Sequence, residues 1–291
     1  MTATTFQTRR EQIRQAKTIH GGMANMLAAS VGVRLSRVPI PSRRLRRKVF
    51  GLVYGNKYQA LDEREMTQPL TAFRSLNELF TRGIREECRP IANVPEGYLC
   101  PCDATIQDAG LLRDDSVMTV KGIDYSLPSL LPDYDIQRFH GGHFAVSFLS
   151  PSDCHRVFCP ADARLLQMTH VPGRRLLVHP PFQRSEFPVF VLNERVILRM
   201  QGDRAKFVLV MVAGWGVGHI THPFPSPLKF HKAKVTHAFP ESPVSFRAGE
   251  WIATFELGST VILITEPDDT LAFQFKPGDA VQYGRPAYAR K

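Results

Sequence analysis

The chain of 291 residues is long enough for one large domain or two small ones, and its 43% hydrophobic and 22% charged content is ordinary for a globular protein. No run approaches the roughly 18 apolar residues of a membrane-spanning helix, and the polar N-terminus lacks the apolar core of a secretory signal, so we expect a protein that is cytosolic or lies on a membrane without crossing it. The net charge of +10 resides in residues 1–60, which carry twelve Lys or Arg and one acid, Glu11, so we expect this basic arm to bind nucleic acid or acidic lipid.

The first eighty residues are predicted to be helical. Residues 8–29 contain few helix breakers apart from one glycine pair. A capping box follows at 75–78 (SLNE), in which a serine hydroxyl and a glutamate carboxylate satisfy free amides at the start of a helix. Between these segments, RRLRRKVFGLVYG after Ser42 has apolar residues at helical spacing beneath a basic face: Leu45, Val49, Phe50 and Val53.

From about Pro90 the sequence is typical of a β-rich body. Short apolar runs alternate with Gly, Pro, Asp and Asn, among them HFAVSFL, RLLQMTHVPG, ERVILRM, WIATFEL and TVILITEP. Many strands with few helices predict an α+β fold, with a β-rich sandwich-like or barrel-like body and a basic helical N-terminal region. We divide the chain into a helical region, 1–89, and a β-rich region, 90–291.

Three polar clusters interrupt the apolar runs. Asp103 follows a Pro-Cys pair, His155 lies in SPSDCHRV, and Gly258 and Ser259 lie in LGST between two runs of strand formers. Glycine inside a strand pattern usually marks a bulge or a close backbone approach, so the simplest interpretation of Gly258 is a bulge at a sheet edge. Taken singly, such residues are more often a turn former, a hydrogen-bonded histidine or a surface hydroxyl than catalytic groups.

The motifs around these clusters point to one family. From about residue 34 onward, the chain resembles phosphatidylserine decarboxylase proenzymes, which make a pyruvoyl cofactor by cleaving themselves. LGST is the family's cleavage signature; it is weak alone, but the ordered set of motifs is specific. The set comprises SLNELFTRGIREECRPI at 75–91, PCDATI at 101–106, KGIDYSLPSLL at 121–131, FHGGHFAVSFLSPSDCHRVF at 139–158, VPG at 171–173, NERV at 193–196, VAGWGVGHI at 212–220, LGST at 257–260 and PGDAVQYG at 277–284.

The resemblance implies self-cleavage between Gly258 and Ser259. The Ser259 hydroxyl attacks the Gly258 carbonyl, and elimination and hydrolysis leave a pyruvoyl group in place of Ser259. Glycine leaves the carbonyl unobstructed, and the weakly nucleophilic hydroxyl needs a base held by an orienting acid. The resemblance puts Asp103 in the position of that acid. The products are a chain ending at Gly258 and a 33-residue chain, 259–291.

The resemblance also implies how the pyruvoyl group works, and it includes one departure. The pyruvoyl carbonyl condenses with the substrate amine and accepts the electron pair released with CO2, and His155 is our candidate for returning a proton to Cα. Family members usually carry a second histidine three residues later, as the base that activates the serine; here that position is Phe158. Either His155 serves both steps, or another histidine such as His219 or His143 replaces it, or cleavage is slow or absent.

The resulting hypothesis is a decarboxylase that converts phosphatidylserine to phosphatidylethanolamine. We expect residues 1–89 to associate with the anionic, cytoplasmic face of the cell membrane as a peripheral region, and residues 90–291 to be the catalytic domain. The expected partners are phosphatidylserine, the anionic membrane surface and the two chains of one proenzyme; a homodimer stays open. No metal site is expected, because the remaining histidines are irregularly spaced and the cysteines lack paired C-x-x-C motifs.

Three alternatives remain open at this stage. The same scaffold could decarboxylate a free amino acid or another amine acid, or the chain could be a non-processing relative that binds anionic lipid. Nucleic-acid binding is the third, but the body is nearly neutral, and such modules usually place aromatic platforms within a basic surface. Binding to liposomes, compared with binding to nucleic acid, distinguishes the lipid and nucleic-acid hypotheses.

Overall fold

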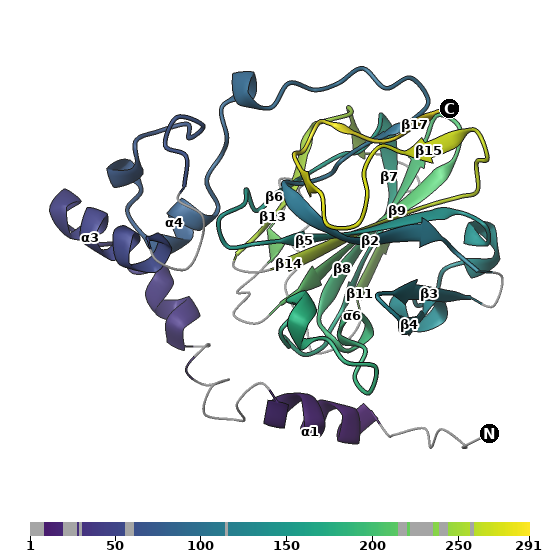
Figure 1. Ribbon diagram of the computed structural model, residues 1–291, viewed down its shortest axis with the longest axis horizontal. Helices are drawn as coiled ribbons and strands as arrows, with labels where there is room; N and C mark the ends of the chain where they lie inside the picture. The colour runs from purple at the N-terminus through teal and green to yellow at the C-terminus, as the bar shows by residue number, and fades with distance from the viewer. Residues whose placement is uncertain are drawn as a thin grey trace.

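A nine-stranded antiparallel sheet forms the centre of the protein (Figure 1). The computed structural model describes residues 9–19, 28, 31–55, 61–113, 116–214, 220–221, 235–238, 244–256 and 259–291. In sheet order the strands are β11 (Val235–Ala238), β7 (Ala163–Val171), β8 (Arg195–Gly202), β9 (Lys206–Ala213), β14 (Ser259–Thr265), β5 (His143–Leu149), β2 (Ala104–Leu111) and β16 (Ala280–Val281), and β12 (Val244–Phe246) also pairs with β7.

Smaller layers cover both faces of this sheet. Figure 1 shows strands β15 and β17 above it and the β3–β4 hairpin with helix α6 below it. The first layer contains two three-stranded sheets, β1 (Tyr98–Leu99), β17 (Pro286–Arg290) and β15 (Leu271–Phe273), and β10 (Ile220–Thr221), β13 (Trp251–Phe255) and β6 (Arg156–Phe158). The opposite layer contains β3 (Val117–Val120), β4 (Ile123–Ser126), α5 (Leu127–Leu130) and α6 (Val189–Leu192). Short 3-10 helices among the described residues span Leu70–Ala72, Glu86–Cys88, Ile136–Phe139 and Pro180–Phe182.

Burial on both faces explains the uninterrupted apolar runs of the sequence. Side chains alternate along a strand, so Val261 and Leu263 of β14 join the core beneath β1, β13 and β17. Ile262 and Ile264 join the core shared with β3, β4, α5 and α6. The predicted α+β class with a sandwich-like body is therefore confirmed, and within the described strands the central sheet is open, with β11 and β16 at its ends.

The strand that begins at Ser259 lies at the middle of the central sheet. Along its length β14 pairs with β9 on one side and with β5 on the other, and Ser259 lies between Ala213 and Leu149. The preceding run, β13, belongs to a different sheet. The apolar pattern around LGST is thus two strands in two sheets, and the residue that follows Gly258 does not lie at a sheet edge; Gly258 itself is outside the described residues.

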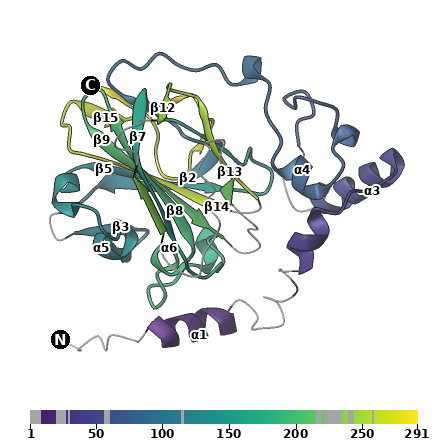
Figure 2. The same ribbon diagram turned by 180° about the vertical axis from the view of Figure 1, so that it is seen from behind.

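Helices dominate the described part of the N-terminal region. Helix α1 spans Arg9–Ile19, residues 31–36 are helical, α3 spans Arg43–Tyr54 and α4 spans Leu76–Phe80. Both views place α4 beside the body, next to the ends of β13 and β14, with α3 on the outer side of α4 (Figure 2). A small core joins these elements; its buried members are Phe50, Tyr54, Met66, Phe73 and Leu79.

Helix α3 forms where its spacing predicts, and its apolar face is only partly buried. Phe50 is buried and Val49 half-buried, but Leu45 and Val53 are 45% and 39% exposed. Tyr54 is buried instead. Only the last turn of the helix, with Phe50 and Tyr54, packs into the small core. Leu52, 80% exposed, extends the apolar surface that α3 leaves open to solvent.

The start of α4 agrees with the predicted capping box. The Ser75 hydroxyl accepts a hydrogen bond from the Glu78 amide at 3.1 Å, and the Glu78 carboxylate accepts one from the Arg74 amide, one residue before the cap. None of the described helices has both the length and the apolar character needed to cross a membrane.

Candidate active site

Ser259 and His155 meet inside the protein. Both side chains are fully buried, and the Ser259 Oγ lies 3.5 Å from His155 Nδ1. Ser259 is the first residue of β14, and His155 directly precedes β6. The contact is at the long limit of a hydrogen bond, as is common for a nucleophile and its base before reaction.

The hydrogen bond at Nε2 of His155 determines whether Nδ1 carries a proton. Nε2 lies 2.9 Å from the backbone carbonyl oxygen of Ser150. A carbonyl only accepts hydrogen bonds, so Nε2 carries the proton, and Nδ1 presents its lone pair to Ser259. Burial lowers the pKa of His155 to about 3, which keeps the imidazole neutral before the reaction. The pair therefore has the geometry of a hydroxyl nucleophile facing a base.

The end of α4 covers this pair. The Phe80 ring stacks on the His155 ring with centroids 3.7 Å apart. Just beyond the helix, Arg82 donates to the Ser152 carbonyl at 2.5 Å, and Arg156 donates to the Thr81 carbonyl at 3.4 Å. Sequence reasoning identified the capping box of α4 but missed Phe80 and Arg82 as neighbours of the site, because no local pattern reports a contact made across about seventy residues.

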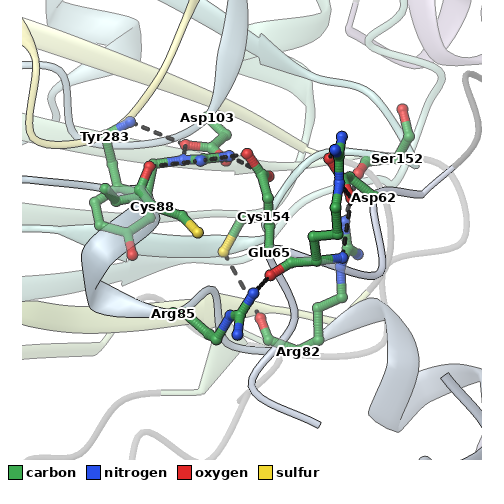
Figure 3. A network of polar contacts seen from close by, with 11 residues as sticks. Asp62, Glu65, Arg82, Arg85, Cys88, Asp103, Ser152, Cys154 and Tyr283 are labelled. Carbon is green, nitrogen blue, oxygen red and sulfur yellow. Dashed lines mark hydrogen bonds and ion pairs between the residues drawn. The ribbon is translucent and has the colours of Figure 1, made fainter. Parts of the chain in front are cut away.

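Asp103 belongs to a separate buried network (Figure 3). Its carboxylate accepts hydrogen bonds from Arg89 at 2.9 and 3.2 Å and from the Tyr283 amide at 2.9 Å. Arg89 also donates to both carboxylate oxygens of Glu65, at 2.9 and 2.8 Å. Burial opposes the charge of Arg89, but the hydrogen bonds to Glu65 and Asp103 raise its pKa further above the usual value, so it stays ionised. The described hydrogen bonds of Asp103 include none to His155 or Ser259.

Phe158 lies beside the Asp103 network. Its ring stacks on the Tyr283 ring at 3.7 Å and 12°, and the Tyr283 amide is the one that binds Asp103. The Phe158 amide donates to the Pro101 carbonyl at 2.7 Å, which ties the strand to the segment that carries Asp103. An aromatic stack thus occupies the position at which the family resemblance led us to expect a histidine, and Arg89 donates hydrogen bonds to both oxygens of the Asp103 carboxylate.

His143 is separated from Ser259 along the sheet. It starts β5, whose other end, Leu149, pairs with Ser259, so six residues or about 20 Å of strand lie between them. Its ring packs among Phe273 and Tyr288, and burial lowers its pKa. The other alternative, His219, lies outside the described residues. Among the described histidines, His155 is the one whose ring nitrogen contacts Ser259.

Asn193 is a third residue whose place near the site the sequence did not reveal. Its fully buried amide donates to the Ala213 carbonyl at 2.8 Å and to the Leu176 carbonyl at 2.9 Å, and its side-chain oxygen accepts from the Leu176 amide. Ala213 ends β9 and pairs with Ser259. Asn193 therefore holds the end of the neighbouring strand in register with the serine. The NERV motif that contains it was its only sequence signal.

Known proteins resemble this chain over most of its length. The sequence model of the family described as phosphatidylserine decarboxylase matches residues 76–289. A relative from Herminiimonas arsenicoxydans named phosphatidylserine decarboxylase proenzyme is 35% identical over 209 residues, 70% of each chain. Proteins of the same name from Azoarcus sp. (strain BH72) and Bordetella pertussis are each 34% identical, over 77% and 71% of this chain and 78% and 71% of their own.

Proposed function

The chain belongs to the phosphatidylserine decarboxylase family, and from this premise we propose that it converts phosphatidylserine to phosphatidylethanolamine and CO2 after cleaving itself between Gly258 and Ser259. The observation that carries the proposal is the buried contact between the Ser259 hydroxyl and the unprotonated nitrogen of His155. In this proposal Ser259 is also the residue from which the pyruvoyl group is made, and strands β5 and β9 and the His155 ring hold it in place.

In the first reaction, His155 acts as the base. Nδ1 takes the hydroxyl proton of Ser259 while Oγ attacks the carbonyl carbon of Gly258. The peptide C–N bond breaks, the imidazolium returns its proton to the freed amine, and an ester joins the two residues. Loss of the Cα proton with cleavage of the Cβ–Oγ bond releases the Gly258 carboxylate, and addition of water with loss of ammonia leaves the pyruvoyl group at position 259.

In the second reaction, the pyruvoyl carbonyl supplies an electron sink for the decarboxylation of a bound amine. The same nitrogen of His155 faces position 259 and is our candidate for returning a proton to the substrate Cα. Burial of His155 beneath Phe80 excludes water, which favours this controlled proton transfer. In this proposal Asp103 does not contact the imidazole. It binds Arg89 and the Tyr283 amide and so stabilises the structure around Tyr283 and Phe158.

The two chains produced by cleavage stay together in this proposal. Strand β14 is hydrogen-bonded to β9 and β5 along its whole length, and β17, near the C-terminus, pairs with β1 from the other chain. Cutting the bond before Ser259 leaves these pairings unchanged. The 33-residue chain therefore continues to supply β14, a central strand of the sheet.

We further propose that the N-terminal region docks on the anionic, cytoplasmic face of the membrane. Exposed apolar side chains accompany exposed cations there, and a lipid surface accepts both. Each cation near such a surface contributes about 1 kcal/mol. The exposed apolar residues are Val31, Leu35, Val38, Leu45, Leu52 and Val53, and the exposed cations of α3 are Arg43, Arg44, Arg47 and Lys48.

Intact mass and product analysis test the proposed function. We expect the purified protein to contain two chains, with a carbonyl-reactive, blocked N-terminus on the 33-residue fragment, and to release CO2 from phosphatidylserine in vesicles but not from free serine. Ser259→Ala should remain one chain and be inactive, because the nucleophile is gone. A wild-type preparation that keeps the single 32.8 kDa mass after long incubation contradicts self-cleavage. Release of CO2 from free serine instead favours the soluble-substrate alternative.

A further inference from the structure

A short turn between β5 and β6 supports His155 from behind. In this turn the Ser150 amide donates to the Asp153 carboxylate at 2.6 Å, and the Asp153 amide donates back to the Ser150 carbonyl at 3.0 Å. The Ser150 carbonyl oxygen also accepts from His155 Nε2 at 2.9 Å. Its two lone pairs are therefore both used, one to close the turn and one to hold the imidazole.

The turn is held on its outer side as well. Arg82, only 5% exposed, donates to the Ser152 carbonyl, and the Ser150 and Ser152 hydroxyls lie 3.0 Å apart. The Cys154 thiol lies 3.7 Å from the Arg82 carbonyl oxygen. These contacts fix the shape of the turn. Among its side chains, the Asp153 carboxylate is the one that bonds the last residue of the turn to the first, Ser150.

We propose that Asp153 is a positioning residue for the base: by binding the Ser150 amide it aims the Ser150 carbonyl at His155 Nε2, which keeps the imidazole proton on Nε2 and the Nδ1 lone pair toward Ser259. The inference rests on the proposed self-cleavage and assigns to a backbone carbonyl the orienting task that the family resemblance implies for Asp103. A neutral imidazole whose Nε2 has no fixed acceptor divides its proton between both nitrogens, and the tautomer with Nδ1–H cannot take the serine proton.

Asp103 is unsuited to this task in the described structure. Both of its oxygens accept hydrogen bonds from Arg89, and one also accepts from the Tyr283 amide. The Ser150 carbonyl, by contrast, contacts the ring directly. Because a carbonyl bears no net charge, it fixes the tautomer without stabilising an imidazolium as a carboxylate does.

The test compares three variants of one type of turn. Asp153→Ala removes the acceptor for the Ser150 amide, and Asp153→Asn keeps an oxygen acceptor without the charge. Asp279→Ala is the matched control, because the exposed Asp279 carboxylate accepts the Lys276 amide at 2.8 Å in the same i to i−3 arrangement away from the site. Cleavage is followed as loss of the full-length chain after pulsed cell-free synthesis.

We expect Asp153→Ala to slow cleavage by about 10- to 100-fold, the range for a misplaced reacting group, while Asp153→Asn and Asp279→Ala cleave at rates close to wild type. Nitrogen NMR of 15N-histidine in full-length, uncleavable Ser259→Ala protein supplies a readout independent of cleavage. His155 should show the Nε2–H tautomer in that protein and with Asp153→Asn or Asp279→Ala added, and a mixture of tautomers with Asp153→Ala.

Two results overturn the inference: an unchanged tautomer and unchanged cleavage in Asp153→Ala, or cleavage as slow in Asp153→Asn as in Asp153→Ala, which assigns the effect to charge. Thermal unfolding of the same variants in the Ser259→Ala protein shows whether each one folds. If the wild-type chain does not cleave at all, the proposed function fails, whereas the tautomer measurement still decides the role of Asp153.

Discussion

At the scale of single residues, the site combines a nucleophile and a base that are both fully buried. Ser259 is held by backbone pairing on both sides, and His155 by the Ser150 carbonyl and the Phe80 ring. The imidazole stays neutral because burial disfavours its charged form. The Phe158 ring, at the position where the resemblance led us to expect a histidine, stacks on Tyr283, and His155 is the described histidine that contacts the serine.

Replacing Phe158 tests whether a base is missing. We expect Phe158→His to change the rate of self-cleavage by less than about tenfold, because His155 already faces Ser259 and Asp103 is bound by Arg89. His155→Ala should leave one uncleaved chain. Phe158→Leu is the control for loss of the stack on Tyr283. The rates come from chain lengths on denaturing gels, and an acceleration of 10²–10⁴-fold in Phe158→His contradicts the assignment of His155 as the base.

At the scale of secondary-structure elements, a helix of five residues forms the cover of the site. Ser75 caps α4, and its last residue, Phe80, is 2% exposed and stacks on His155. Leu79 of the same helix faces the other way, into the core that also contains Phe50 and Phe73. Helix α4 therefore connects the core beneath α3 to the catalytic pair. A shift in the packing of that core is expected to move Phe80 against His155.

A comparison of two buried phenylalanines distinguishes the covering role of Phe80 from a general contribution to stability. Phe80→Ala and Phe73→Ala each remove a side chain that is at most 3% exposed, and each should lower the free energy of unfolding by about 3–5 kcal/mol. Only Phe80→Ala should also slow self-cleavage, because His155 loses its stacking partner and gains access to water. Calorimetry on Ser259→Ala versions gives the stabilities. Equal cleavage rates in the two variants contradict a covering role for Phe80, and the Phe80→Leu and Phe73→Leu pair serves if the alanine variants do not fold.

At the scale of the whole molecule, the positive charge and six of the ten exposed large apolar residues described lie in the first sixty residues of the chain. The exposed cations of α3 lie next to Leu45, Leu52 and Val53. Arg46 is different, because its side chain donates to the Ile40 and Thr71 carbonyls at 2.6 and 3.0 Å and so holds the region together. Arg37 forms an ion pair with Glu256, three residues before Ser259, which links this end of the chain to the cleavage segment.

Charge removal on α3 tests the membrane proposal. Replacing Arg43, Arg44, Arg47 and Lys48 with Gln should weaken binding to vesicles rich in anionic lipid by at least tenfold, since each cation contributes up to about 1 kcal/mol. Turnover of a short-chain substrate in detergent should change little. A control protein with four exposed cations of the body replaced, Lys121, Arg164, Arg247 and Lys276, has the same net charge and should sediment with vesicles like wild type. Equal loss in both proteins means that overall charge, not the arm, determines binding.

The strands and the cleavage motif could be predicted from the sequence because both depend on residues close together in the chain. Two-sided burial of β14 appears as an uninterrupted apolar run, the cap of α4 as Ser-x-x-Glu, and the reactive serine as part of LGST. The place of β14 in the middle of the sheet and the partial burial of the α3 face could not be predicted in this way, since strand order and helix docking decide which residues lie at an edge or in a core.

Which side chains meet was decided by tertiary structure alone. His155 and Ser259 are 104 residues apart and come together because β6 and β14 belong to different layers of one sandwich. Asp103, expected beside the base, instead lies between Arg89 and Tyr283, since a buried carboxylate is stable only where donors surround it, and the fold supplies them from residues 14 and 180 positions away. Composition and residue spacing do not predict such long-range contacts, because the free energy that stabilises these contacts comes from burial and pairing across the whole fold.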